Sequence, residues 1–455
     1  MSAPNLTIKV EPTEASAIVY GALAPETSND PSNGQLSLVL TITNKEPSPV
    51  YLNQVTVSFL GPPSVTPSSI TADLKILPTE TEQWYFAPAN NIILPVPAPG
   101  AIKLALSYDG VNPDETLNTD KFSDPATVDM PLAQYQSPAT GGGYSFPTRT
   151  DDLKQGEYWS GLSAAHGPAG GGTQLFAYDL WVRAYDSSTN QWPTRPAGAN
   201  IANNESYYTW GKPIYAMADG VVEQFKDGIP ANTPPGKPTP TPALVEGNHF
   251  YIQHGVDLAL YAHFQAGKMN SELMSGPNPD DTGAPVAKGQ LLGLAGNSGN
   301  SSEPHLHIQV NRTTTPWGGP PRPLPFNDIK VLDLSAVDPD PWPPNTDTPW
   351  STVSAQCLPE LLSAIWPGEL LLGRNIFRRW LEALAWAWII IIGGSMVTPG
   401  GIECIRCGRA LTRALGVVSM ALGVLGLVSQ TRAGRAGVTQ RFTPQQIDVK
   451  GDMHS

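Results

Sequence analysis

The chain has 455 residues, including 43 Gly and 47 Pro, and its formal net charge at pH 7 is −13. This length predicts two or three domains at roughly 150 residues each, and the many Gly and Pro residues favour short strands and turns over long helices. The negative charge argues against nucleic acid as a partner, because phosphate binding needs a basic surface.

Charge and cysteine are unevenly distributed along the chain. From residue 351 onward, nine Arg and one Lys stand against four Glu and two Asp, which is a net of +4 and leaves −17 for the first 350 residues. All three cysteines, Cys357, Cys404 and Cys407, lie in the last quarter. No disulfide framework is therefore expected in the acidic body, and the tail is expected to be organised separately.

Residues 1–130 show the alternation of apolar and polar side chains that is typical of strands. The runs at 35–44, 51–60, 69–77, 82–88 and 101–110 are separated by turns rich in Pro, Gly, Asn and Ser. Short strands at this spacing predict an N-terminal Ig-like β-sandwich, Ig-like in architecture only because the Cys–Trp–Cys pattern is missing. No cluster of reactive side chains occurs here, so we expect a spacer or binding domain.

A linker is expected at residues 131–157, and strand patterns return in a second domain at 158–335. Two long loops interrupt this domain, at 186–204 and at 226–247, and the second contains the polyproline-like run PPGKPTPTP. Loops of this length in a compact domain usually have a function or are disordered.

The tail begins with a Pro-rich linker at 336–368 and continues into an apolar segment at 369–430. Ala383–Ile402 has 20 residues without a charge and Ala414–Gln430 has 17, whereas a membrane-spanning helix needs about 20 mostly apolar residues. Two interpretations stay open, a membrane hairpin that brings residues 370–430 into contact with lipid, and a buried or interfacial helical hairpin. Residues 431–455 are expected to be a flexible tail.

The cysteines of the tail also allow two interpretations. Cys404 and Cys407 have the spacing of half a zinc knuckle, but no second pair follows and Cys357 is distant. Free or palmitoylated thiols beside an apolar helix are the interpretation that we favour.

The segment HLHIQV at 305–310 carries the clearest sign of chemistry. Its alternation predicts a strand, on which residues two apart point to the same face. His305 and His307 should therefore project together, with Leu306 in the core behind them. Two buried imidazoles side by side need a partner, so we expect a metal ion or a catalytic role.

Six of the seven histidines lie between positions 166 and 307. A catalytic zinc typically takes three N or O ligands and leaves a fourth position for water. A nearby general base must accept the proton of that water, and His is the commonest choice. The candidates in this region are His166, Asp179, His263, His305 and His307.

A family resemblance joins these candidates. The segments GKPIYAMADGVV (211–222), GNHFYIQHG (247–255), LYAHF (260–264) and VAKGQLLGLAGNSGNSSEPHLHIQV (286–310) follow one another as in the lysostaphin/LytM-type zinc metallopeptidases. The resemblance extends over about residues 160–330 and implies a small antiparallel sheet that holds one zinc ion. It implies that His166, Asp179 and His307 bind the metal and that His263 and His305 are catalytic.

The sequence departs from the family pattern at one ligand. The family has three residues between the first His and the Asp, whereas twelve separate His166 from Asp179 here. Gly170–Gly172 provide a flexible loop that allows His166 to approach the metal. His254 is expected to be a structural residue at a strand end, and His249 to be solvated or in the wall of a substrate groove. The segment 268–284 is expected to shape that groove.

The resemblance implies a zinc-dependent endopeptidase that hydrolyses peptide bonds of bacterial peptidoglycan. The alternative is a catalytically inactive relative that binds or regulates in the cell envelope, and a third hypothesis is a membrane-tethered protein with a structural metal. No cleavable signal is seen at the N-terminus. We therefore expect a cell-envelope or extracellular location through a non-standard export route or a tail anchor, with a cytoplasmic location left open.

Overall fold

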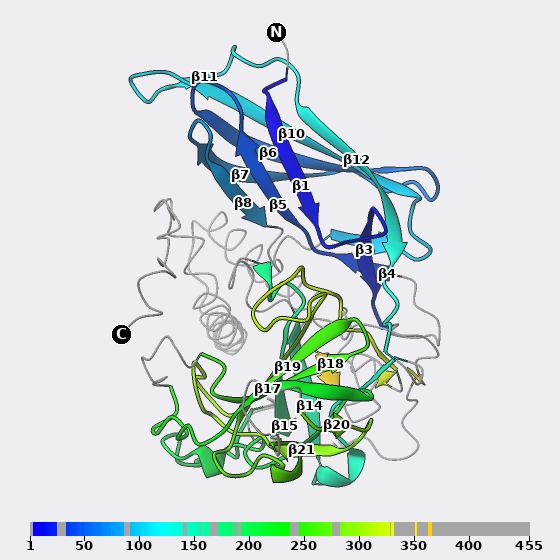
Figure 1. Cartoon of the computed structure of the whole chain (residues 1–455), viewed down its shortest axis with the longest axis vertical. Coiled ribbons are helices and arrows are strands. Elements are labelled where there is room, and N and C mark those ends of the chain that lie inside the picture. The colour runs from blue at the N-terminus through cyan, green and yellow to red at the C-terminus, as the bar shows by residue number, and fades with distance from the viewer. Residues whose placement is uncertain are drawn as a thin grey trace, which may run out of the picture. The chain divides into compact units, whose positions relative to one another are not determined.

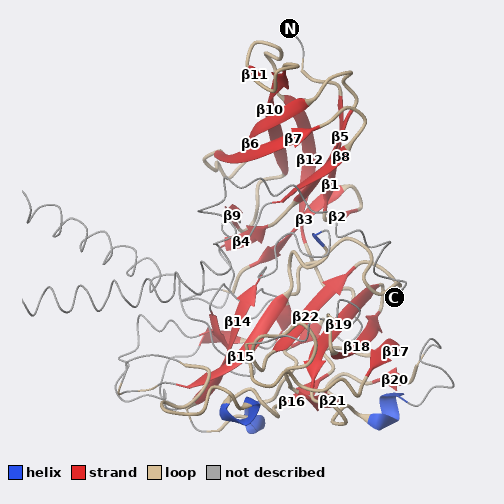
Figure 2. Ribbon diagram, turned by 90° about the vertical axis from the view of Figure 1, so that its left-hand side faces the viewer, coloured by secondary structure: helices blue, strands red, loops and turns tan. Residues whose placement is uncertain are grey.

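The structure is a computed structural model of the chain. It describes residues 3–331, apart from 25–32, 86–91, 140–142, 155, 164–171, 185, 187, 189–192, 237–244, 275–282 and 328, together with 351–352 and 363–365. Within these ranges the chain forms strands and loops, with three short 3-10 helices (Figure 2). These are η2 (Thr150–Asp152), η4 (Asn204–Ser206) and η6 (Ser271–Met274). The expectation of a mainly β protein is confirmed.

The first part of the chain forms two sheets. One has three antiparallel strands in the order β1 (Leu6–Glu11), β5 (Val39–Asn44), β8 (Thr81–Tyr85). The larger sheet follows the path β7 (Ser68–Ile76), β6 (Val50–Leu60), β10 (Ala101–Val111), β12 (Ala126–Gln134), β3 (Ala17–Ala22), β4 (Asn33–Leu36), β9 (Ile92–Pro95), with β2 (Thr13–Glu14) and β11 (Leu117–Asn118) at its side. All five strand runs predicted in this region contain strands, and the first is divided between β4 and β5.

Apolar side chains of both sheets form one buried cluster. Val10, Leu40 and Trp84 come from the smaller sheet, and Leu52 and Leu104 are among the members from the larger one. The larger sheet is not purely antiparallel, because β12 pairs with β3 in parallel. The Ig-like topology stays a prediction, as do the expected domain boundaries.

A third sheet has eight strands (Figure 1), and two of them contain His263 and His307. Its strands are all antiparallel. Their order is β20 (Pro285–Val286), β17 (Gly220–Lys226), β18 (Asn248–His254), β19 (Asp257–Phe264), β22 (Leu306–Asn311), β15 (Tyr178–Ala184), β14 (Glu157–Ser163), β26 (Ser363–Ile365). Three two-stranded sheets accompany it, formed by β13 (Tyr144–Ser145) with β23 (Phe326–Asn327), β16 (Pro213–Tyr215) with β21 (Leu291–Leu294), and β24 (Lys330–Val331) with β25 (Ser351–Thr352).

The two faces of the eight-stranded sheet differ in chemistry. Alternate residues such as Ile252, Tyr261 and Ile308 belong to one large buried apolar cluster. The residues between them form the opposite face, where His307 of β22 lies directly between Ala262 of β19 and Asp179 of β15. Because the pairing partners on adjacent strands share a face, this register brings together residues that are far apart in the sequence.

Most of the expected tail lies outside the described residues. This applies to the apolar segment 369–430, to residues 431–455, to all three cysteines, and to most of the expected linker 336–368. Two short strands in that linker range are described, and one of them, β26, pairs with β14. The described part of the chain contains no helix with the length and hydrophobicity of a membrane span.

Candidate metal centre

The centre is built on β22, where the predicted alternation is confirmed. Leu306, Ile308 and Val310 lie in the apolar core with exposed fractions of 1%, 0% and 1%, while His307 faces the other way beside Asp179. His305 lies just before the strand and forms an isolated bridge with Gly296. His305 and His307 are thus on the same side of the strand, as the sequence predicts.

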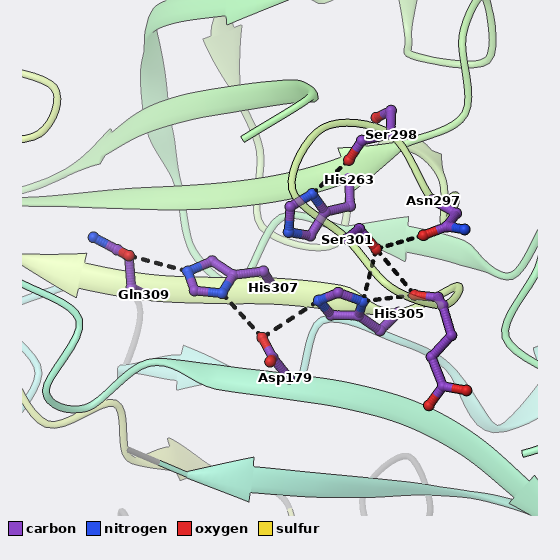
Figure 3. A network of polar contacts seen from close by, with 9 residues as sticks. Asp179, His263, Asn297, Ser298, Ser301, His305, His307 and Gln309 are labelled. Atoms are coloured by element: carbon purple, nitrogen blue, oxygen red, sulfur yellow. Dashed lines mark hydrogen bonds and ion pairs between the residues drawn. The ribbon is translucent and has the colours of Figure 1, made fainter. Parts of the chain in front are cut away.

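Asp179 lies between the two histidines (Figure 3). Its Oδ1 atom is 3.0 Å from His307 Nδ1 and 3.4 Å from His305 Nε2. The exposed fractions of Asp179, His305 and His307 are 8%, 6% and 3%. The carboxylate is therefore largely removed from water and lies against two imidazole nitrogens. This environment favours a metal ion or proton transfer.

His263 reaches the same centre because β19 is irregular. Asn248 pairs with Phe264 and Phe250 pairs with Tyr261, so Ala262 and His263 together oppose the single residue His249. Such a bulge interrupts the alternation of side chains. His263 also has a positive φ of 71°, which is uncommon for a residue other than glycine. Its ring centroid lies 4.7 Å from that of His305 and 5.9 Å from that of His307.

Backbone carbonyls determine which nitrogen of each catalytic candidate carries a proton. His263 Nδ1 lies 2.8 Å from the carbonyl oxygen of Ser298, and His305 Nδ1 lies 2.8 Å from that of Glu303. A carbonyl oxygen can only accept a hydrogen bond, so Nδ1 must be the donor in both rings. In the neutral state each ring then has its lone pair on Nε2, and in His305 this atom is directed at Asp179.

The pKa values of the two rings move in opposite directions. Burial, together with the neighbouring His305 and His307, holds the pKa of His263 well below its usual value. Burial also opposes protonation of His305, but the charge and hydrogen bond of Asp179 outweigh it and raise its pKa. His263 is thus the ring that favours the neutral, proton-accepting form, and His305 is the ring that more readily holds a proton.

The loop before His305 is held by an amide network that sequence reasoning missed. Asn297 is fully buried; its amide nitrogen donates to Asn204 Oδ1 at 2.8 Å and its oxygen accepts from Ser301 Oγ at 2.6 Å. Asn232 donates to the carbonyl oxygens of Gly299 and Ser301, each at 2.8 Å. Ser301 Oγ lies 3.2 Å from His305 Nδ1. Only the turn-forming composition of this loop was visible in the sequence.

Trp181 is a further neighbour of the centre that the sequence did not disclose. It follows Asp179 by two residues on β15, so it projects from the same face. Its ring centroid lies 5.6 Å from that of His305, with 32° between the planes. Within the described part of the chain, its buried indole Nε1 has no hydrogen-bond partner. No local pattern marks this residue, because its role depends on which strands are neighbours.

His254 and His249 have hydrogen-bond partners other than the residues of the centre. His254 is fully buried on the core side, with Nδ1 3.0 Å from the carbonyl oxygen of Asp219 and Nε2 3.0 Å from Tyr261 Oη. This supports the structural role expected for it. Of the two alternatives expected for His249, solvation is wrong, because only 7% of it is exposed and its ring packs edge-on against Tyr251. A place in the wall of a substrate groove stays a prediction. His249 Nδ1 bonds to the carbonyl oxygen of Gly247, while its buried Nε2 has no hydrogen-bond partner among the described residues.

Two of the three residues predicted to bind zinc lie together at the centre, and their role as ligands stays a prediction. Asp179 Oδ1 and His307 Nδ1 face each other, and carboxylate oxygen with imidazole nitrogen is a donor set that suits zinc. His166, the third predicted ligand, lies outside the described residues. Within the part of the chain that the structure describes, no group of three or more His, Cys, Asp or Glu side chains is arranged to hold a metal ion.

Comparisons with known proteins address this region directly. Residues 198–318 match the model of Peptidase family M23. The matched range contains His263, His305 and His307, and it begins after Asp179. The position of Asp179 at the centre follows instead from the pairing of β15 with β22. A search of curated proteins finds no significant match.

Several solved structures are similar to parts of the chain. They include a catalytic-domain variant of the prophage-encoded M23 protein EnpA from Enterococcus faecalis (18% identity, 31% of this chain and 86% of that chain covered, TM-score 0.17). A putative peptidase M23 from Pseudomonas aeruginosa has 14% identity over 58% of this chain and 90% of that chain, with a TM-score of 0.19. A zinc-containing peptidase from Vibrio cholerae has 13% identity over 47% and 78%, with a TM-score of 0.14.

These identities and TM-scores are too low to support an argument about activity. The family model is the finding that bears on the predicted resemblance, and it covers three of the five candidate residues. The resemblance to the lysostaphin/LytM-type peptidases is thereby confirmed for this region, and residues 198–318 have the sequence characteristics of peptidase family M23.

Proposed function

We propose that this chain is a zinc-dependent metalloendopeptidase that hydrolyses peptide bonds of bacterial peptidoglycan. The observation that carries the proposal is the convergence of Asp179 Oδ1 and His307 Nδ1 at 3.0 Å, beside two histidines whose Nδ1 atoms are bonded to carbonyl oxygens. The match to Peptidase family M23 supports a peptidase. Peptidoglycan as the substrate rests on the family resemblance of the sequence.

Asp179 and His307 would hold the zinc ion together with His166. When bound, zinc would polarise the peptide carbonyl and make water acidic enough to serve as the nucleophile at neutral pH. Asp179 also holds His305 in place, because its Oδ1 lies 3.4 Å from His305 Nε2. The burial of all these groups strengthens their electrostatic interactions, since water screens them poorly there.

His263 and His305 would divide the proton transfers between them. His263 is kept neutral by burial, so its Nε2 is suited to accept the proton of the attacking water. His305 more readily carries a proton, so its Nε2 is suited to donate to the departing amine nitrogen. General acid and base groups need pKa values that match these tasks.

The substrate class also bears on location. Peptidoglycan lies outside the cytoplasmic membrane, so we propose that the protein acts in the cell envelope or outside the cell. The segment 370–430 is proposed to contribute membrane contact. Protease protection of the tail in isolated membranes, compared with the same protein in solution, tests this part of the proposal.

The proposal is tested with the full chain. Dialysed wild-type protein should contain one zinc and release new amino and carboxyl ends from purified peptidoglycan, as read by mass spectrometry. His307→Ala and Asp179→Ala should lose both zinc and hydrolysis, and His166→Ala tests the third ligand. Zinc in the wild type without hydrolysis of any peptide substrate would support the alternative of an inactive binding or regulatory protein.

A further inference from the structure

A row of three polar side chains continues from the metal centre along β22. His307, Gln309 and Asn311 occupy alternate positions on the same face, and their exposed fractions are 3%, 2% and 4%. His307 Nε2 lies 3.0 Å from Gln309 Oε1, and Gln309 Nε2 lies 2.8 Å from Asn311 Oδ1. The intervening residues, Ile308 and Val310, show that this strand carries apolar side chains where only packing is required. Two buried amides next to a metal ligand therefore call for a different explanation.

The row has a direction, which is set at its far end. Asn311 Nδ2 lies 2.8 Å from the carbonyl oxygen of Thr173 and 3.3 Å from that of Gly319. Both carbonyls can only accept, so the nitrogen of the Asn311 amide must face them and its oxygen must face Gln309. That oxygen can only accept as well, so the Gln309 nitrogen must face Asn311 and the Gln309 oxygen must face His307.

The same reasoning then reaches the imidazole. Gln309 Oε1 can only accept a hydrogen bond, so His307 Nε2 must carry a proton. The other ring nitrogen, Nδ1, is the one that lies 3.0 Å from Asp179 Oδ1 (Figure 3). A histidine ligand binds a metal through the nitrogen that has no proton, and the hydrogen bond on the other nitrogen determines which one that is.

We propose that Gln309 is a positioning residue that, anchored by Asn311, holds His307 with its proton on Nε2 and offers Nδ1 to the metal beside Asp179. This inference rests on the proposed zinc site and deepens it. The row of amides contributes in two ways: it keeps a proton on His307 Nε2 when the metal takes the place of any proton on Nδ1, and it restrains the ring against rotation. Loss of such an outer partner typically lowers metal affinity by about 10-fold to 100-fold.

The first experiment measures the zinc dissociation constant of the full chain by competition with a chromophoric chelator. Gln309→Leu should weaken zinc binding by about 10-fold to 100-fold. Gln309→Glu should weaken binding less than Gln309→Leu does, because its carboxylate still accepts from Nε2–H although it can no longer donate to Asn311 Oδ1. Asn311→Leu should give a smaller loss, because it leaves Gln309 in place but frees its amide to rotate. Gln253→Leu is the matched control, since Gln253 lies on the same face in β18 and bonds to the carbonyl oxygen of Gly255.

The second experiment reads the tautomer directly. Zinc-loaded protein labelled with ¹⁵N at its seven histidines should show His307 with metal on Nδ1 and a proton on Nε2 in two-bond ¹H–¹⁵N correlation spectra. The His307 signal is assigned by its loss in His307→Gln. In Gln309→Leu the Nε2 proton should exchange faster with water, an effect that a purely structural role would not produce.

The outcomes separate this inference from the proposed function. Zinc bound to the wild type with unchanged affinity in Gln309→Leu would overturn the positioning role of Gln309 and leave the zinc site intact. Metal found on Nε2 of His307 in the wild type would also overturn it. A wild-type protein that binds no zinc would overturn the proposed function instead. The unfolding temperature of each metal-free variant shows whether that variant is folded. If Gln309→Leu does not fold, Gln309→Glu and Asn311→Leu still test the proposal.

Discussion

At the scale of single residues, the centre combines groups of the same type with different environments. His263, His305 and His307 lie close together, yet each has a different hydrogen-bond partner on the nitrogen that faces away from the centre: the carbonyl oxygen of Ser298, that of Glu303, and the side chain of Gln309. In His305 and His307 these partners leave the other ring nitrogen to face Asp179. The sequence shows only three histidines. Their different hydrogen-bond partners are what support different proposed roles for them.

The division of roles predicts distinct effects of substitution. His263→Ala and His305→Ala should each retain zinc and lower kcat by about 100-fold to 10,000-fold, which is the usual contribution of general acid–base catalysis. Zinc content and kcat measured on the same samples test this. Loss of zinc in either variant would make that histidine a ligand and contradict its proposed role.

His254 predicts a dependence of stability on pH that is independent of the metal centre. It is fully buried between the carbonyl of Asp219, the hydroxyl of Tyr261 and the ring of Tyr144. Burial lowers its pKa to about 4, below the ordinary value of about 6.5. The unfolded chain therefore binds a proton at a higher pH than the folded chain. The contribution of neutral His254 to the free energy of unfolding is complete above about pH 6.5 and is lost as pH falls toward 4.

The expected loss in the free energy of unfolding is about 2 kcal/mol between about pH 7 and about pH 5. Denaturant unfolding of the wild type and of His254→Gln at the two pH values measures it. The variant should lose this part of the pH dependence. An identical pH dependence in both proteins would show that His254 does not contribute.

At the scale of elements, the loop between β21 and β22 positions His305 through buried amides. Asn297→Ala removes the bonds to Asn204 and Ser301 and leaves buried polar groups without those partners. We expect a loss of about 1–3 kcal/mol in the free energy of unfolding, together with a lower kcat at unchanged zinc content. Asn300→Ala is the control in the same loop, because Asn300 is exposed. Equal kcat values in the two variants would contradict a positioning role for the loop.

The elements also show where sequence reasoning succeeds and where it stops. The alternation in HLHIQV correctly places His305 and His307 on one face, because strand periodicity is local. The bulge at Ala262 and His263 breaks that periodicity, so alternation alone would have sent His263 to the core face beside Tyr261. Asp179 lies 128 residues from His307, so no local pattern shows that the two side chains meet. Gln309 was not recognised because its orientation depends on the side-chain amide of Asn311.

At the scale of the whole molecule, the mainly β composition is predictable from Gly, Pro and the strand runs, while strand order is not. The parallel pairing of β12 with β3 and the place of β22 between β19 and β15 are long-range choices that no local pattern records. The longer interval between His166 and Asp179 was visible in the sequence, and the position of His166 stays a prediction.

Zinc should stabilise the whole chain if the proposed site exists, because a ligand that binds only the folded state adds free energy by mass action. At a free zinc concentration about 100-fold above the dissociation constant, the gain is about 2.7 kcal/mol. Thermal unfolding with and without zinc measures the shift, with Asp179→Ala as the control that should not respond. An equal shift in that variant would place the zinc elsewhere.

The most direct test of the central claim is the anomalous X-ray scattering of zinc in crystals of the full chain. The account predicts one zinc ion bonded to His307 Nδ1 and to Asp179 at about 2.0–2.2 Å, the usual range for such ligands, with Gln309 Oε1 on the far side of the His307 ring. A zinc ion bound to other residues, or crystals grown with zinc that show none at this centre, would contradict it.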